Sequence, residues 1–174
     1  QSGIRGSYFA AKAGLFARVL PEDGTAVINL ADPRGAEMAD VARDRGQSVL
    51  TVGFEPGADL RIRAQRFDAT GQELRFEWLG HARQLRLNLI GGFQAENVLA
   101  AAGLAIGAGS GPERVFSVLP ELVTVRGRMQ LAATRPNGAA VFVAYAHTPA
   151  ALATALRALR PHVMGRSGVL VRAG

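Results

Sequence analysis

The sequence has no cysteine, and it has a single lysine, Lys12, beside nineteen arginines. The absence of cysteine excludes disulfide bonds, thiolate metal sites and a cysteine nucleophile, and it favours a cytoplasmic protein. No apolar run approaches the roughly 20 residues that a membrane-spanning helix requires, and no segment has the pattern of a signal peptide. The composition therefore excludes a disulfide-stabilised domain and argues against a membrane protein.

Length and charge narrow the remaining classes. The 174 residues, 48% of them hydrophobic, predict one compact domain with room for a small subdomain. The formal charge of +6 is compatible with binding of a nucleic acid or of an anionic small molecule such as a nucleotide. The arginines are scattered and form no basic run, so the charge alone does not choose between these ligands.

The first third of the chain predicts alternating helices and strands. Residues 1–7 carry no periodic pattern and are interpreted as a linker or as a start added during cloning. The predicted elements are a helix over 7–20, a strand over 26–30, a helix ending at Arg45 and a strand over 48–54. This alternation predicts a parallel sheet covered by helices.

Between Asp59 and Leu89 the hydrophobic period changes to two, in three runs separated by short turns. This pattern predicts an antiparallel meander with one apolar and one polar face. The polar face carries both arginines and glutamates, whereas Phe76 and Trp78 belong to the apolar face. A sheet that binds single-stranded nucleic acid needs aromatic rings on its polar face, so the pattern argues against a nucleic-acid partner.

The second half predicts helices and strands again, at 93–108, 112–119, 127–133, 139–146 and 149–159, with a further strand possible over 167–171. Thr148 is the expected N-cap of the helix that starts at Pro149. The predicted fold class is α/β: a partial parallel sheet flanked by helices, with a small three-stranded antiparallel sheet.

Lys12 is the first candidate for chemistry. Lysine, unlike arginine, can lose its proton when it is buried, and its amine can act as a nucleophile or be covalently modified. The alternative is an ordinary exposed charge on an amphipathic helix, which is the more common situation of a lone helical lysine.

Four segments together resemble the Mur ligases, most closely those of the MurE type. They are Tyr8–Phe16 (YFAAKAGLF), Gly92–Asn97 (GFQAEN), Gly127–Met129 (GRM) and Tyr145–Pro149 (YAHTP). The resemblance covers residues 8–163 and implies the latter part of the family's central ATP-binding domain. It implies that residues 164–174 begin the connection to a C-terminal domain that is absent here.

The resemblance also implies the chemistry. MurE-type ligases use ATP and Mg2+ to join diaminopimelate or lysine to UDP-N-acetylmuramoyl-L-alanyl-D-glutamate, and neither a nucleic acid nor a membrane takes part. In the family the lysine at the position of Lys12 is carbamylated, and the resulting carboxylate helps to hold the magnesium ion. A hard cation prefers oxygen ligands, which a carbamate supplies and an ammonium does not.

Four further residues are implied at the nucleotide site: Asn97 near the adenine ring, Arg128 on phosphate or ribose, and His147 with Thr148 between a strand and a helix. Each residue alone has a simpler interpretation. Asn97 could bond locally within its helix, Arg128 could be solvated, and His147 could be a structural histidine.

The sequence also departs from the family pattern. It contains no phosphate-binding Gly-x-x-Gly-Lys-Thr/Ser run. Alanine replaces an expected aspartate at Ala31, Ala144 and Ala150, and Gln130 replaces a glutamate. We therefore expect a ligase fragment or variant that is inactive alone. The alternatives are a non-catalytic, engineered or degenerate scaffold of the same fold, and a folylpolyglutamate synthase relative.

Overall fold

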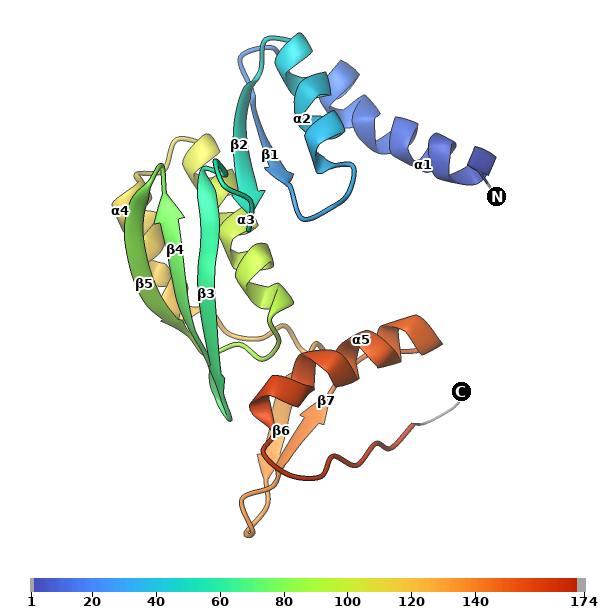
Figure 1. Ribbon diagram of the computed structural model, residues 1–174, viewed down its shortest axis with the longest axis vertical. Coiled ribbons are helices and arrows are strands. Elements are labelled where there is room, and N and C mark those ends of the chain that lie inside the picture. The colour runs from blue at the N-terminus through green and yellow to red at the C-terminus, as the bar shows by residue number, and fades with distance from the viewer. Residues whose placement is uncertain (1, 172–174) are drawn as a thin grey trace. The chain divides into compact units, whose positions relative to one another are not determined.

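The computed structural model describes residues 2–171, with side chains described from Tyr8 onward. The chain divides into two compact units (Figure 1). Unit 1 comprises Gln1–Arg63, Phe76–Arg83 and Glu96–Ser117, and unit 2 comprises Ala64–Arg75, Gln84–Ala95 and Val118–Gly174. In the described part of the chain, no helix has the length and apolar character needed to cross a bilayer.

Unit 1 begins with the predicted alternation of helix and strand. Its first elements are α1 (Ser2–Gly14), a π-helical continuation (Leu15–Val19), β1 (Thr25–Asn29), α2 (Gly35–Asp44) and β2 (Ser48–Gly53). The first helix starts at Ser2, so the predicted helix start at Ser7 was wrong. Strands β1 and β2 pair in parallel, as predicted, from Thr25↔Ser48 to Asn29↔Val52.

Small side chains bring α2 onto β1. The cluster between them contains Ala26, Ile28, Ala39 and Ala42, all of them buried. At Gly35, the first residue of α2, a Cβ atom would lie 2.3 Å from the carbonyl oxygen of Asn29. Only glycine fits this approach, which fixes the start of α2 directly beside the end of β1.

The meander forms β3 (Leu60–Asp68), β4 (Gly71–Trp78) and β5 (His81–Leu87) in a sheet with the order β1-β2-β3-β4-β5. The predicted α/β class is confirmed, with one difference: the antiparallel strands continue the parallel sheet. The parallel overlap of β2 with β3 is short, Val52↔Leu60 and Gly53↔Arg61. Such a small overlap lets a short loop replace the long crossover that parallel strands usually need.

The alternation of buried and exposed residues is confirmed in β4, where Gln72, Leu74 and Phe76 are buried. In β3 the more buried positions switch from even to odd residue numbers after Arg63: Ala64 is exposed, whereas Gln65 and Phe67 are half-buried. The prediction that Ala64 continues the apolar face was therefore wrong. Phe67 takes that place because its ring packs on the imidazole of His162, with the ring centroids 5.0 Å apart.

The helices of the second half are α3 (Phe93–Gly107) and α4 (Pro112–Val118), which a short 3-10 turn (Leu119–Glu121) follows. Within unit 1, Phe116 of α4 makes edge-on contacts with the rings of Phe76 and Trp78, at centroid distances of 5.3 and 6.0 Å. These contacts account for the aromatic residues on the apolar face of the meander.

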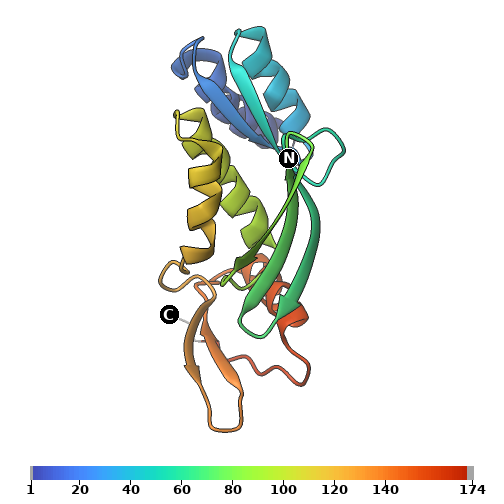
Figure 2. The same cartoon turned by 90° about the vertical axis from the view of Figure 1, so that its left-hand side faces the viewer.

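Unit 2 contains a separate antiparallel hairpin, β6 (Gln130–Thr134) with β7 (Ala140–Val143), and the helix α5 (Pro149–Leu159) that ends in a 3-10 turn (Arg160–His162) (Figure 2). Both strands are shorter than predicted. No strand forms over 167–171, so that prediction was wrong. These residues are exposed and have no neighbouring strand among the sheets of residues 2–171. Residues 172–174 of the predicted connection lie outside the described residues.

Candidate functional site

A cavity of about 380 Å³ in unit 2, which we call the α5 cavity, brings together three of the four sequence motifs. Phe93 comes from the second motif, Arg128 and Met129 from the third, and Tyr145 with Ala146 from the fourth. The helix α5 completes the wall with small side chains: Ala150, Ala151, Thr154 and Ala155. Residues spread over the sequence from Phe93 to Ala155 thus line one largely apolar cavity, and Arg128 adds a guanidinium group to its wall.

Backbone hydrogen bonds hold the third motif against the fourth. The N–H of Tyr145 donates to the carbonyl oxygen of Gly127, with N and O 2.7 Å apart. The N–H of Gly127 in turn donates to Oε1 of Gln130 at 3.1 Å. Gln130, at a position where the resemblance implies a glutamate, therefore closes the turn that contains Arg128.

Met129 in this turn has a left-handed backbone, with φ at +55°, and its side chain is only 4% exposed. A non-glycine residue in this region costs roughly 1 kcal/mol or more, and such residues concentrate at functional sites. Nothing in the local sequence indicates this conformation, because methionine has no preference for it.

His147 and Thr148 directly follow Tyr145 and Ala146, which line the α5 cavity, and both are exposed, but neither lines the cavity itself. The imidazole of His147 stacks obliquely near the ring of Tyr145, with the centroids 4.9 Å apart. Oγ1 of Thr148 accepts the backbone N–H of Ala151 at 3.2 Å, which confirms the predicted N-cap. The cap leaves the amino end of α5, with its partial positive charge, next to the cavity.

Lys12 lines a different cavity, of about 630 Å³, in unit 1. Its polar lining comes from Tyr8, Asn29, Asp32 and Arg34, and its apolar lining includes Phe9, Phe16, Val27 and Met38. Lys12 is exposed, and its Nζ lies 4.6 Å from the centroid of the Tyr8 ring. Because the side chain is exposed, it lacks the desolvated setting that favours the neutral amine needed for carbamylation.

The unmodified residues of this cavity do not fit a magnesium ion. The lining contains one carboxylate, Asp32, together with two cationic side chains. The amide of Asn29 is already engaged, because its Nδ2 donates to Oε2 of Glu96 at 3.0 Å and its Oδ1 accepts the N–H of Ala31 at 2.9 Å. In the part of the chain with described residues, no group of three or more His, Asp or Glu side chains could hold a metal.

Asn97 lies in α3, on its exposed side, and belongs to unit 1 with Lys12. Of the predicted site residues, the structure places Arg128 in the wall of the α5 cavity. His147 and Thr148 belong to the same unit, and Lys12 and Asn97 belong to the other unit.

Comparison with known proteins identifies the family. Residues 3–105 match the Mur ligase middle domain. The chain belongs to the Mur ligase family. Over 170 residues it is 42% identical to the UDP-N-acetylmuramoyl-L-alanyl-D-glutamate–2,6-diaminopimelate ligase of Bradyrhizobium diazoefficiens, a match that covers 96% of this chain and 35% of that enzyme. This Mur ligase chain thus spans about a third of the length of the curated relative that it matches.

Solved structures agree with this assignment. A UDP-N-acetylmuramoyl-L-alanyl-D-glutamate–2,6-diaminopimelate ligase superimposes with a TM-score of 0.75 at 30% identity, covering 91% of this chain and 32% of that one. The folylpolyglutamate synthase of Mycobacterium tuberculosis, complexed with ADP, superimposes with a TM-score of 0.64 at 27% identity. The match covers 86% of this chain and 33% of that one. The Mur ligase chain therefore shares its fold with both kinds of enzyme, and its similarity to the diaminopimelate ligases is the greater.

Two buried polar residues of unit 2, Gln72 and His162, were not among the residues that the sequence motifs predicted. Gln72 precedes Leu74 and Phe76 in β4 at the same spacing of two residues. The period of two in the sequence could therefore have predicted that it lies on the buried face. His162 follows a proline and precedes an exposed segment, and nothing in its local sequence marks it as buried.

Proposed function

We propose that this chain supplies nucleotide-binding elements of a MurE-type ligase. The enzyme would work in the cytoplasm and join diaminopimelate or lysine to UDP-N-acetylmuramoyl-L-alanyl-D-glutamate at the expense of ATP. The observation that carries the proposal is the α5 cavity, because three of the four family motifs line it. The names of the curated relatives support the substrate class, since they are diaminopimelate ligases that share 35–42% identity with this chain.

The chemistry of the α5 cavity suits a nucleotide. Phe93 and Tyr145 offer aromatic surface, and the alanines of α5 offer a flat apolar wall for a base. Arg128 provides a permanent positive charge and a fork of donors for phosphate or ribose oxygens. The amino end of α5 adds backbone donors and a partial positive charge that favour an anion. Asn97 belongs to unit 1 and does not line this cavity, so it is a separate candidate for an adenine contact, through a side-chain amide that can both donate and accept.

Lys12 would act separately from the α5 cavity, as a ligand of the magnesium ion. Carbamylation would convert its cation into a carboxylate, which together with Asp32 would give two oxygen ligands. Magnesium is commonly held by one or two carboxylates plus phosphate oxygens, so this modified donor set would fit the ion. The ion would stabilise the negative charge of the transferred phosphoryl group.

The chain alone is proposed to bind nucleotide weakly and not to complete the ligase cycle. It has no Gly-x-x-Gly-Lys-Thr/Ser run to enclose the phosphates, and alanine stands at two cavity positions, Ala144 and Ala150, where the family pattern has aspartate. The competing proposal is a scaffold of the same fold without ligand binding, which these same departures favour.

Calorimetric titration of the chain with ADP and magnesium separates the two proposals. Arg128→Ala should weaken binding about tenfold or more, because a hydrogen bond to a charged group contributes about 1.5–3 kcal/mol. Arg135→Ala is the matched control: it removes an exposed arginine of unit 2 that does not line the α5 cavity. A folded chain that binds no nucleotide, or equal losses in the two variants, would refute a nucleotide site at Arg128.

A further inference from the structure

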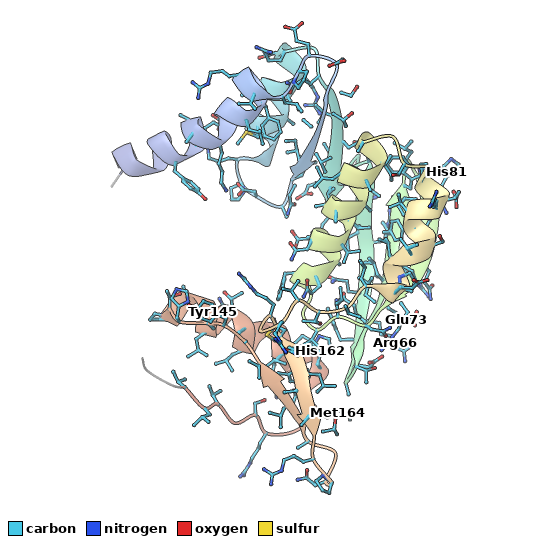
Figure 3. The ribbon with its side chains drawn as sticks, turned by 180° about the vertical axis from the view of Figure 1, so that it is seen from behind. Arg66, Glu73, His81, Tyr145, His162 and Met164 are labelled. Atoms are coloured by element: carbon cyan, nitrogen blue, oxygen red, sulfur yellow. The ribbon has the colours of Figure 1, made fainter. Side chains whose placement is uncertain are left out.

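His162 is buried, and both nitrogens of its ring are engaged. Nε2 accepts the backbone N–H of Gly91 at 3.0 Å, and Nδ1 lies 2.6 Å from the backbone carbonyl oxygen of Asp68. Figure 3 labels this residue beside Met164, whose side chain is fully exposed although it lies only two positions further along the chain.

These partners determine the form of the imidazole. A backbone N–H can only donate, so Nε2 must carry a free lone pair, and a carbonyl oxygen can only accept, so Nδ1 must carry the proton. The edge of the ring is held by Phe67, at a centroid distance of 5.0 Å and an interplanar angle of 74°. His162 is therefore a neutral, oriented histidine with a single arrangement of donor and acceptor.

The hydrogen bond to Gly91 joins two walls of the α5 cavity. His162 lies in the 3-10 turn that directly follows α5, and α5 forms one wall. Gly91 is two residues before Phe93, which forms another wall. The position of Phe93 relative to α5 thus depends on a contact between residues 71 positions apart.

The packing around Gly91 leaves little tolerance. Its φ is +103°, and a Cβ atom at this position would lie 2.7 Å from Cε1 of Phe93 and 3.2 Å from Cβ of Ala158. The backbone of the turn therefore fills the space between the Phe93 ring and α5. A small movement of this turn must change the separation of the two walls.

Two glutamines of the sheet bind the carbonyl groups of the same turn. Nε2 of Gln72 donates to the carbonyl oxygen of Gly91 at 3.0 Å, and Nε2 of Gln65 donates to that of Gly92 at 2.8 Å. The two glutamines bind carbonyl groups, and His162 binds the N–H. Its imidazole is the contact by which the segment after α5 reaches the backbone of this turn.

We propose that His162 is a positioning residue for the nucleotide: its neutral imidazole sets the separation between Phe93 and α5 and hence the fit of the base in the α5 cavity. This inference rests on the proposed function of that cavity. His162 does not line the cavity, and it acts through Gly91.

The first test needs no ligand. His162→Phe keeps a ring against Phe67 but removes both hydrogen bonds, whereas Phe67→Leu removes the ring contact and keeps both hydrogen bonds. Backbone amide NMR spectra of the two variants should differ at the cavity. We expect His162→Phe to shift the amides of Phe93 and Ala151 and to speed hydrogen exchange at Gly91, and Phe67→Leu to leave them nearly unchanged.

The second test is the affinity for ADP and magnesium. His162→Phe should weaken binding about tenfold, since it leaves the buried N–H of Gly91 without an acceptor, and Phe67→Leu should change it less than about twofold. If His162→Phe does not fold, His162→Gln, which retains a donor and an acceptor, takes its place, and we expect a smaller loss.

The outcomes separate the two proposals. Wild-type protein that binds no ADP would refute the nucleotide proposal, and the amide shifts would still decide whether His162 positions the cavity. Shifts confined to the direct neighbours of residue 162, or equal losses of affinity in both variants, would overturn the role proposed for His162.

Discussion

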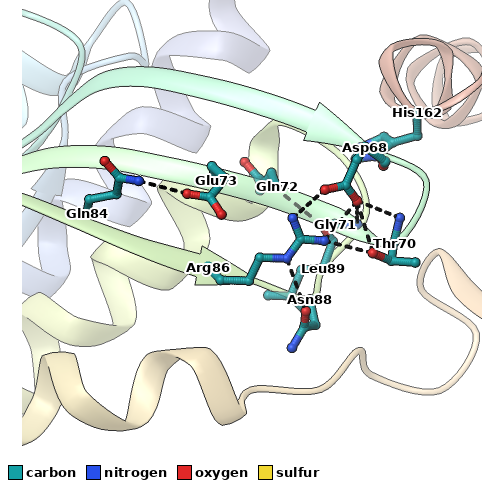
Figure 4. A network of polar contacts seen from close by, with 10 residues as sticks. All are labelled: Asp68, Thr70, Gly71, Gln72, Glu73, Gln84, Arg86, Asn88, Leu89 and His162. Carbon is teal, nitrogen blue, oxygen red and sulfur yellow. Dashed lines mark hydrogen bonds and ion pairs between the residues drawn. The ribbon is translucent and has the colours of Figure 1, made fainter.

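Arg86 and Asp68 form a two-pronged ion pair between β5 and the end of β3. Nη2 of Arg86 donates to Oδ1 of Asp68 at 2.8 Å, and Nη1 donates to Oδ2 (Figure 4). The backbone N–H of Thr70 donates to the same carboxylate at 2.9 Å. The hydrogen bonds from Arg86 and Thr70 hold the pKa of the Asp68 carboxyl well below its ordinary value.

The first prediction concerns acid stability. A carboxyl whose pKa is lower in the folded state contributes stability above its unfolded pKa of about 4, and this contribution is lost as the pH falls through the folded value. Asp68→Asn should therefore lower the free energy of unfolding at pH 7 by about 0.5–1 kcal/mol, a range limited by solvent screening of this exposed pair. The variant should also lose less stability than wild type between pH 4 and pH 2.

Urea unfolding at several pH values measures both effects. Asp40→Asn is the control, because the pair of Asp40 with Arg43 lies on the exposed side of α2, with N and O 3.0 Å apart. Equal acid sensitivity of Asp68→Asn and wild type would contradict the prediction.

A second prediction concerns the buried amide of Gln72. Its Nε2 donates to the carbonyl oxygen of Gly91 and its Oε1 accepts from Gln65 at 2.7 Å. Gln72→Leu has a similar volume but leaves these partners unsatisfied, so we expect a loss of about 1–3 kcal/mol in the free energy of unfolding. Gln84→Leu, at an exposed position of β5, should change it by less than about 0.5 kcal/mol. Comparable losses would show that the buried network contributes no special stability.

A third prediction restores an acid at the α5 cavity. Ala144 lines this cavity, and the resemblance to the Mur ligases implies an aspartate at its position. In Ala144→Asp a carboxylate could accept the ribose hydroxyls, and we expect ADP to bind about fivefold more tightly, a gain of about 1 kcal/mol. Ala132→Asp adds the same charge at an exposed position of β6 and should give no gain. An equal gain for 2′,3′-dideoxy-ADP would rule out ribose recognition as the cause.

A fourth prediction concerns Lys12. Because its ammonium is exposed and stacked on Tyr8, we expect the isolated chain to carry no more carbamate at Lys12 than a short lysine peptide does. Carbon-13 NMR in labelled bicarbonate measures the carbamate, and Lys12→Arg identifies the signal, since the chain has no other lysine. A highly occupied carbamate would contradict the expectation and would make a magnesium titration the next experiment.

Local features of the sequence were enough to predict most elements. The period of two in β4 identified Leu74 and Phe76 as buried, and Thr148 before Pro149 identified the start of α5. Both signals depend on neighbouring residues alone: strand side chains alternate between faces, and a helix cap bonds to a residue three positions on. The four motifs likewise pointed to the Mur ligase family through residue identity and spacing alone.

By itself, then, the sequence determined the family, the α/β class and the candidate residues. Tertiary structure decided that Phe93, Arg128 and Tyr145 line one cavity, that Lys12 is exposed, and that β3 continues the parallel sheet. It also decided the role of His162, whose two partners are 71 and 94 positions away in the chain. Contacts over such distances depend on how the whole chain packs, and no local pattern in the sequence records them.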